Sequence, residues 1–238
     1  MTTPPRQLTP TGKLRVGINL GNFLLVTKGA DGQVRGIVPD LAQELARRLG
    51  AAVEFVLYAQ AGEVADAAKT GAWDVAFIGA EPQRASEIDF TAAYLEIEAT
   101  YLVPAGSPIK SLQEVDRKGV RVAVSGRSAY DLWLSRNIKH AELRRAEGIE
   151  GSYQLFVKEK LDVLAGLKPR LLQDREKLPG SKILEGRFTA VQQAIGTPKG
   201  RPEAARYLRA FAEDIKASGL VAQGIERHGV RGVSVAAH

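Results

Sequence analysis

The chain has 238 residues, of which 45% are hydrophobic and 25% are charged, and its formal net charge is +6. These proportions are ordinary for a folded globular protein, and they exclude collagen-like or largely disordered chains. The sequence contains no cysteine, which excludes disulfides and thiolate chemistry, and no apolar run approaches the length that spans a membrane.

The first half of the sequence alternates predicted strands with predicted helices. We expect strands at 13–19, 53–57, 73–78 and 98–103, and helices at 39–49 and 64–69. The first of these helices opens at Pro39 and ends at Gly50, which is the usual asymmetry of helix ends. Strands that alternate with helices in this way indicate parallel βαβ units with right-handed crossovers.

The alternation restarts after a proline- and glycine-containing segment at 104–108. The second half predicts strands at 121–124, 142–146, 162–165 and 191–195, and helices at 128–138, 169–177, 202–216 and 220–227. The last two helices have no sheet of their own, so we expect them to pack on the sheet of the first half. No internal repeat is evident.

The excess of positive charge lies in the middle of the chain. Residues 106–195 contain 17 Lys and Arg against 11 Asp and Glu, whereas the rest of the chain contains 16 of each kind. A solvated basic surface is one interpretation, and an electrostatic field that attracts anionic ligands is the other. The excess is not interleaved with aromatic residues, so we expect no nucleic-acid partner.

Two consecutive segments carry a specific resemblance. Residues 73–79 read WDVAFIG and residues 82–94 read PQRASEIDFTAAY. In order and spacing they resemble the family 3 solute-binding proteins, the polar amino acid receptors of bacterial ABC importers. LRVGI at 14–18, GIVPDL at 36–41 and SGRSAY at 125–130 add support. The resemblance extends from Lys13 to about His228.

This resemblance implies an α/β fold of the type II periplasmic-binding-protein kind. Such a fold has two lobes, each a central sheet flanked by helices, joined by two crossover strands that would fall near 102–105 and 193–197. The first lobe would then comprise residues 1–104 and 196–238, and the second residues 105–195. The ligand would bind between the lobes, and its contacts with both would favour a closed state.

Arg84 matches the family arginine that binds the ligand's carboxylate. A guanidinium fork can donate two parallel hydrogen bonds to a carboxylate, which a lysine cannot reproduce. The alternative is an exposed arginine at the start of a short helix. Ser128 matches a hydroxyl position of the second lobe, and it also has the sequence context of an N-cap. Both roles are compatible, since a helix start favours anions, and Arg127 adds charge there.

The loop after the first strand and the second crossover supply further candidates. Asn19 and Asn22 match family positions that contact the ligand, although both residues are also common in turns. Gln192 and Gln193 lie at the second crossover, where they would either line the cleft or bond between the lobes. We expect Phe23 and Tyr94 in the core.

Two departures from the family pattern affect the choice of ligand. The segment between Asp74 and Arg84 is two residues shorter, and its Ser and Thr positions become Gly79, Ala80 and Glu81. The aspartate that binds the ligand's ammonium falls on Leu167 or Lys168. A desolvated ammonium needs a counter-charge, so we expect a carboxylate-bearing anion rather than an ordinary amino acid, unless Glu81 replaces that aspartate.

We therefore expect a solute-binding protein that takes a small carboxylate-bearing ligand and catalyses no reaction. We expect no cofactor and no insertion into the membrane. The protein would act as a monomer, with an ABC permease as its partner. The alternatives are a dehydratase resembling cyclohexadienyl dehydratase, with Glu81 as its acid, and a cytoplasmic sensor. The three histidines, His140, His228 and His238, lack metal-ligand spacing. As written, the chain starts without a secretory signal, which predicts the cytoplasm, or the periplasm if a signal was trimmed.

Overall fold

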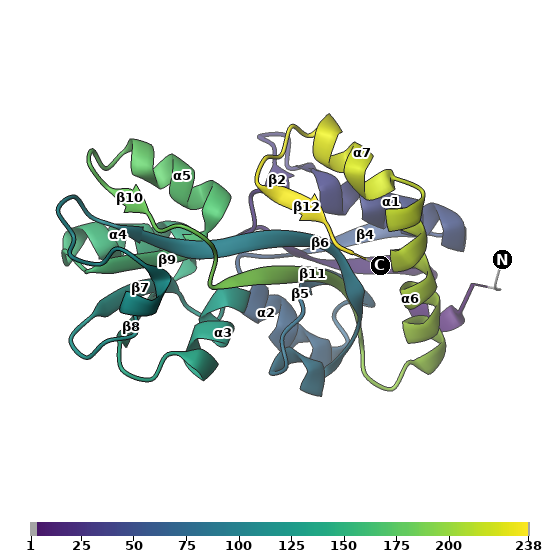
Figure 1. Cartoon of the computed structure of the whole chain (residues 1–238). Helices are drawn as coiled ribbons and strands as arrows, with labels where there is room; N and C mark the ends of the chain where they lie inside the picture. The colour runs from purple at the N-terminus through teal and green to yellow at the C-terminus, as the bar shows by residue number, and fades with distance from the viewer. Residues whose placement is uncertain (1–3, 238) are drawn as a thin grey trace. The chain divides into compact units, whose positions relative to one another are not determined.

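The computed structural model describes residues 4–237, so His238 and the first three residues of the predicted first lobe lie outside the described part. By their internal contacts the described residues form two compact units. Unit 1 comprises the residues up to Glu96 together with those from Gln192 onward, and unit 2 comprises Ile97–Val191. The two long strands β6 (Ile88–Val103) and β11 (Thr189–Pro198) each continue from one unit into the other (Figure 1).

The sheet of unit 1 is built on three parallel strands in the order β4-β1-β5. These strands span Ala52–Tyr58, Lys13–Asn19 and Val75–Gly79 respectively. Strand β11 pairs antiparallel with β5, and β6 lies beside β11. A short C-terminal strand, β12 (Val233–Val235), also pairs with β6. The predicted strands of the first half therefore form one sheet, as the alternating pattern indicates.

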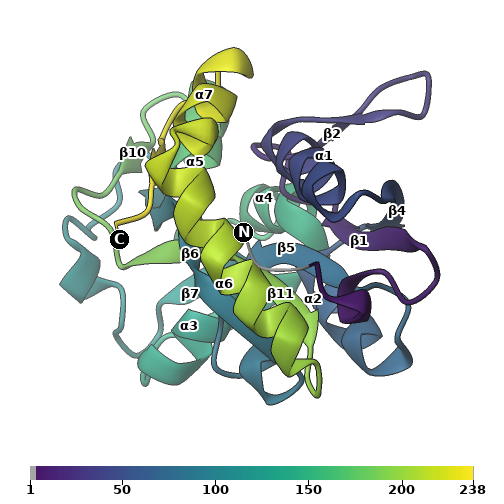
Figure 2. The same ribbon diagram turned by 90° about the vertical axis from the view of Figure 1, so that its right-hand side faces the viewer.

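The helices of unit 1 are α1 (Ile37–Leu49), α2 (Ala61–Asp66), α6 (Pro202–Ala217) and α7 (Leu220–Arg227). Short 3-10 helices occupy Arg6–Leu8, Ala67–Thr70 and Arg84–Ser86, and a two-stranded ribbon joins β2 (Thr27–Lys28) to β3 (Val34–Arg35). Helices α6 and α7 follow one another along unit 1 (Figure 2), and α7 packs beside α1. The C-terminal pair therefore packs on the first unit, as expected.

Helix α1 shows how local sequence sets an element. Ile37, Leu41 and Leu45 are buried at helical spacing, and they form the face that packs inward. Gly50 follows the helix in the left-handed conformation, and its N–H donates to the carbonyls of Ala46 and Arg47. Glycine adopts this conformation without strain, so the helix ends here.

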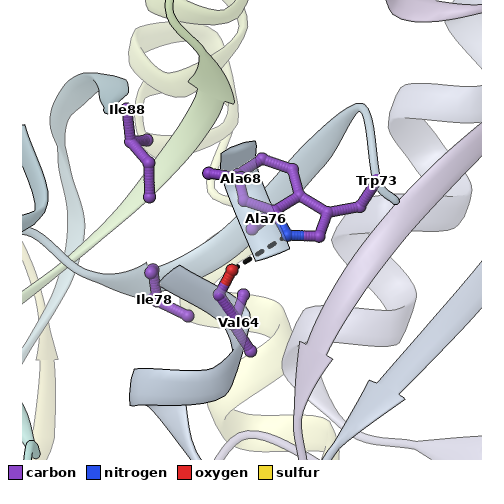
Figure 3. Packing of buried hydrophobic residues seen from close by; sticks show 6 residues of the cluster. All are labelled: Val64, Ala68, Trp73, Ala76, Ile78 and Ile88. Carbon is purple, nitrogen blue, oxygen red and sulfur yellow. Dashed lines mark hydrogen bonds between the residues drawn. The ribbon is translucent and has the colours of Figure 1, made fainter. Parts of the chain in front are cut away.

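Trp73 organises one core cluster of unit 1. Its side chain is fully buried, and its Nε1 donates a hydrogen bond of 2.9 Å to the carbonyl oxygen of Val64 (Figure 3). The aliphatic residues packed with it are Val64, Ala68, Ala76, Ile78 and Ile88. A buried indole N–H needs a hydrogen-bond partner. The bond from Trp73 therefore links α2 to strand β5, which begins two residues after Trp73.

Unit 2 repeats the parallel arrangement in the order β9-β7-β8. These strands span Val163–Leu167, Arg121–Ser125 and Glu142–Ala146. Strand β6 runs antiparallel to β9, and β10 (Lys182–Ile183) pairs with β6. The helices are α3 (Ala129–Asn137), α4 (Gly148–Lys158) and α5 (Lys168–Glu176), with a 3-10 helix at Leu112–Glu114. The core cluster joins Phe156 of α4 and Leu171 of α5 to the sheet.

Several elements differ from the sequence-based expectations, among them the short strands β2, β3 and β10, which the sequence did not predict. Helix α4 occupies 148–158, a segment for which the sequence predicted no element. Strand β6 begins at Ile88 rather than at residue 98, because the pairing with β11 extends it through the segment 88–97. Strand β12 was not predicted, since three residues give no periodic signal.

An arginine–aspartate clamp recurs in the two units. In unit 1 the backbone N–H and Nε of Arg15 donate to Asp74 Oδ2 at 3.2 and 2.9 Å. In unit 2 the same two groups of Arg121 donate to Asp162 Oδ2 at 2.8 and 3.0 Å. Each aspartate directly precedes the strand that lies beside the strand of its arginine. The clamp therefore fixes corresponding strands, and it constitutes a repeat that the sequence did not reveal.

Candidate ligand-binding site

The candidate residues of unit 1 gather at one edge of its sheet. Strands β1 and β5 are parallel neighbours, with Val16 opposite Val75, so the loops that follow them leave the sheet at the same edge. Asn19 ends β1, and Gly79 ends β5. In open α/β sheets ligands bind outside the carboxyl ends of the strands, which makes this edge the candidate site of unit 1.

The loop after β1 is fixed by its own polar groups. Asn19 Oδ1 accepts a hydrogen bond of 3.0 Å from the N–H of Gly21, so this side chain forms the turn expected as its alternative role. The side chain of Asn22 is buried, and within residues 4–237 its Oδ1 is enclosed without a hydrogen-bond partner. In this conformation Asn19 Oδ1 is engaged in the turn, and Asn22 Oδ1 is enclosed within the loop.

Arg84 is held close to the end of β5. It begins the 3-10 helix Arg84–Ser86, and only 5% of its surface is exposed. Its NH1 donates a hydrogen bond of 2.7 Å to the carbonyl oxygen of Gly79, and its N–H donates to the carbonyl oxygen of Glu81. The alternative of an exposed surface arginine is therefore wrong. A buried guanidinium lies at the edge where ligands bind in such sheets.

The neighbouring residues link this edge to β11. The N–H of Ala80 donates a hydrogen bond of 2.8 Å to the carbonyl oxygen of Gln192. The Gln192 side chain donates from Nε2 to Glu96 Oε1 at 3.0 Å, and Gln193 is buried in the pairing opposite Gly79. The amide of Gln192 is thus engaged by a carboxylate of its own unit.

The candidate residues of unit 2 lie at the start of α3, directly after β7. Ser128 is the N-cap, and its Oγ accepts a hydrogen bond of 3.1 Å from the N–H of Asp131. The buried Asp131 carboxylate accepts in return from the N–H of Arg127 at 2.7 Å and from Arg145 Nε. This resembles the expected capping box, except that the carboxylate reaches one residue further back than the cap.

The side chains around this helix start differ in exposure. Arg127 is exposed, with a φ of 60°, a left-handed conformation that the hydrogen bond to Asp131 holds in place. Tyr130, in the first turn, is buried, and burial raises its pKa to about 12. The phenol therefore stays neutral near neutral pH, and Arg127 and Arg145 are both cations beside this helix start.

Lys168 begins α5, directly after β9. Its Nζ lies 2.7 Å from Glu98 Oε2, and both side chains are partly exposed, at 39% each. Arg187 NH1 lies 3.6 Å from the other oxygen of the same carboxylate. The preceding residue, Leu167, is buried, so the position at which the sequence lacks an aspartate holds a core leucine and a paired lysine.

The structure thus collects the candidates into two groups, one at the carboxyl edge of each sheet. Glu98 and Arg187 were missed, because they lie on and beside the long strands, where no motif marks them. The alternation of Glu96 and Glu98 with buried Ile97 could have indicated acids on one face of a strand.

Two further features are absent from residues 4–237. Over this range no helix combines the length and the apolar character that crossing a membrane requires. In the same range, no group of three or more His, Asp and Glu side chains is placed to hold a metal ion.

Solved structures share this fold at low sequence identity. The receptor for L-cysteine of Neisseria gonorrhoeae is 20% identical, with a TM-score of 0.80, over 94% of each chain. A putative ABC transporter binding component from Wolinella succinogenes, complexed with lysine, is 22% identical, with a TM-score of 0.76, over 91% of this chain and 95% of its own. At these identities the likeness shows the fold alone.

A third structure is an ancestral protein. The ancestral amino acid-binding protein AncCDT-1, a precursor of cyclohexadienyl dehydratase, is 24% identical, with a TM-score of 0.76, over 93% of this chain and 97% of its own. The predicted α/β fold of two sheet-and-helix units is confirmed. No curated protein sequence matches this chain. The model of the bacterial extracellular solute-binding proteins, family 3, matches residues 14–230, and the chain belongs to that family.

Proposed function

We propose that this protein is a solute-binding protein that captures a small carboxylate-bearing ligand and delivers it to an ABC importer. Membership of the family supports binding as the activity. The observation that carries the choice of ligand is the buried guanidinium of Arg84 at the carboxyl edge of unit 1. A planar guanidinium fits a carboxylate well, since the carboxylate can accept two parallel hydrogen bonds from it.

Groups of unit 2 support the same ligand chemistry. The start of α3 offers backbone N–H groups and the positive end of a helix, and Arg127 adds an exposed cation beside it. Ser128 Oγ accepts from Asp131 and keeps a hydroxyl hydrogen with which it could donate to an anion. These groups favour an anionic ligand.

The ligand is, in this proposal, an organic anion rather than a zwitterionic amino acid. The related structures are described as receptors for L-cysteine or as complexed with lysine. In this chain the position that the family resemblance assigns to the ammonium-binding aspartate holds the buried Leu167 and a lysine that is paired with Glu98. An ammonium group there would be desolvated beside a cation, which is unfavourable.

A thermal-shift and calorimetric screen over amino acids, organic acids and aromatic acids tests the proposal. A ligand that binds only the folded protein raises its melting temperature. We expect carboxylates without an ammonium group to give the largest shifts. Tight binding of a zwitterionic amino acid, with no response to any organic acid, would contradict this choice of ligand.

The role of Arg84 is tested with Arg84→Lys and Arg84→Gln, and Arg209→Gln on α6 is a matched control at an exposed position of the same unit. Loss of a charge-assisted bidentate pair should weaken carboxylate binding by at least about tenfold. The control should bind as the wild type does. Unchanged affinity in both Arg84 variants would remove the guanidinium from the site.

Catalysis is not part of the proposed function. Incubation with prephenate or arogenate should yield no aromatic product, and turnover of either would establish the dehydratase alternative. The importer role also requires that the protein lie outside the cytoplasmic membrane. Fractionation of cells should therefore recover it in the periplasm, and recovery in the cytoplasm would favour the sensor.

A further inference from the structure

A cavity of about 300 Å³ lies within unit 2, where the end of β6 and the turn after it meet β10. Strand β6 runs antiparallel to β9, so its end at Val103 lies beside the start of β9. The cavity is therefore at the opposite end of the sheet from the carboxyl edge, and it is separate from the helix start at Ser128. All of the residues that line it belong to unit 2.

Much of the lining is apolar, and hydrogen bonds fix its backbone. The N–H of Leu184 donates to the carbonyl oxygen of Tyr101 at 2.9 Å, and the N–H of Ile109 donates to Ser107 Oγ at 3.2 Å. Two of the apolar residues, Pro104 and Ile183, are partly exposed, so apolar surface faces water there. A hydrocarbon group that covers this surface releases that water, which favours binding. The apolar lining residues are Val103, Pro104, Ile109, Ile183 and Leu184.

The charged lining consists of two lysines and one glutamate, Lys110, Lys182 and Glu185, and its formal charge is +1. Lys110 Nζ donates a hydrogen bond to the carbonyl oxygen of Ser107, which leaves two of its three donors for a ligand. Within residues 4–237 the side chains of Lys182 and Glu185 form no hydrogen bond or ion pair, so the glutamate neutralises neither lysine by direct contact. The surplus positive charge matches a ligand with one negative charge.

We propose that this cavity binds a small amphipathic anion, a monocarboxylate with an aliphatic chain, at a site that does not involve Arg84. The carboxylate binds Lys110 and Lys182, and the chain covers the apolar lining. The volume is at the lower end of the range for small-molecule sites, which favours a short chain. Both lysines belong to the basic excess of residues 106–195, so this cavity gives the anion-attracting interpretation of that excess a specific place.

A series of monocarboxylates tests both parts of the ligand. Acetate, butyrate, hexanoate and octanoate are titrated by calorimetry into the wild-type protein and into Arg84→Gln. We expect the affinity in Arg84→Gln to rise by up to about fourfold for each methylene group until the cavity is filled. The neutral analogue 1-hexanol should bind more weakly than hexanoate, and added salt should weaken hexanoate binding. Affinity that is independent of chain length, equal affinity for 1-hexanol, or no binding at all would overturn the proposal.

Variants locate this binding at the two lysines. Lys110→Met and Lys182→Met should each weaken hexanoate binding by up to about fivefold, and the double variant should weaken it more than either. Lys158→Met is the matched control, because Lys158 is an exposed lysine at the end of α4 in the same unit and does not line the cavity. Circular dichroism checks that each variant is folded. Unchanged hexanoate affinity in a folded double variant would also overturn the proposal.

The outcomes separate this site from the proposed function. If Arg84→Gln abolishes all hexanoate binding and the double lysine variant keeps it, the cavity binds no carboxylate and the proposed function stands. If the double lysine variant abolishes carboxylate binding and Arg84→Gln leaves it unchanged, the cavity site stands and the role proposed for Arg84 fails.

Discussion

The arginine–aspartate clamp is buried in unit 1 and exposed in unit 2, so the free energy of unfolding that each clamp contributes can be compared. The Asp74 side chain is fully buried and accepts four hydrogen bonds: three from Arg15, at 2.8, 2.9 and 3.2 Å, and one of 2.9 Å from Arg201. In Asp74→Asn one oxygen becomes an NH₂ group that faces two guanidinium groups. The variant loses the negative charge and about half of the hydrogen bonds.

The magnitude follows from burial. Breaking a buried charged pair by changing one partner costs about 3–5 kcal/mol. The Arg15 and Arg201 side chains are 20% and 22% exposed, so water compensates them in part and we expect the lower end, about 3 kcal/mol. The control Asp162→Asn changes the same contacts with Arg121, but both side chains there are more than a third exposed. It should cost no more than about 1 kcal/mol.

Urea unfolding measures the difference. In a Trp133→Phe background the remaining tryptophan, Trp73, directly precedes Asp74 and reports on unit 1 alone, and circular dichroism follows the whole chain. We expect a lower midpoint for Asp74→Asn at an unchanged slope. An equal cost for the two variants would refute the argument that burial of the carboxylate determines the strength of the clamp.

Two further predictions follow from α1 and its surroundings. Glu44 accepts hydrogen bonds from Arg47 and Arg48, and chiefly the bond from Arg47 lowers the pKa of Glu44 from 4.5 to about 2. The stability that the ionised Glu44 contributes is therefore present above pH 4.5 and is lost as the pH falls toward 2. Glu44→Gln should therefore lose stability at neutral pH but unfold in acid with a shallower dependence on pH, and an unchanged acid profile would disprove this. Gly36 has a φ of 131° and a ψ of −175°, and a Cβ there would lie 2.4 Å from the carbonyl oxygen of Leu25, so Gly36→Ala should cost more than about 2 kcal/mol. Gly12→Ala, at positive φ in open space, should cost less, and equal melting temperatures for the two would contradict the steric argument.

Much of the fold could be predicted because local patterns and tertiary structure agree. The predicted strand at 142–146 has the observed bounds, and the predicted helix at 128–138 differs from α3 by one residue at each end. Ser128 marks that helix start both in the sequence and in the structure, because a hydroxyl that accepts from the N3 backbone is a local interaction. Such interactions need no knowledge of the rest of the chain.

The missed elements depend on contacts that are distant in the sequence. Helix α4 contains Gly148 and Gly151, which weaken a helical pattern, and burial of Phe156 in the core of unit 2 compensates for them. The ion pair of Glu98 with Lys168 also escaped prediction, since the two residues are 70 positions apart in the sequence and meet only through the pairing of β6 with β9. The burial of Arg84 likewise depends on the position of its 3-10 helix against Gly79.

The recurrence of the clamp shows what the two units share and where they differ. Arg15 and Asp74 are 59 residues apart, whereas Arg121 and Asp162 are 41 apart, so no fixed period exists for a sequence comparison to find. Both clamps nevertheless hold a first strand to the neighbouring parallel strand, and in both units that neighbouring strand leads to a cationic candidate residue, Arg84 after β5 and Lys168 after β9. A rigid sheet can present different groups at its carboxyl edge without any change in its own packing. The common clamp therefore stabilises the same pair of strands in both units, and the residues that follow the second strand of each pair set the chemistry of the ligand.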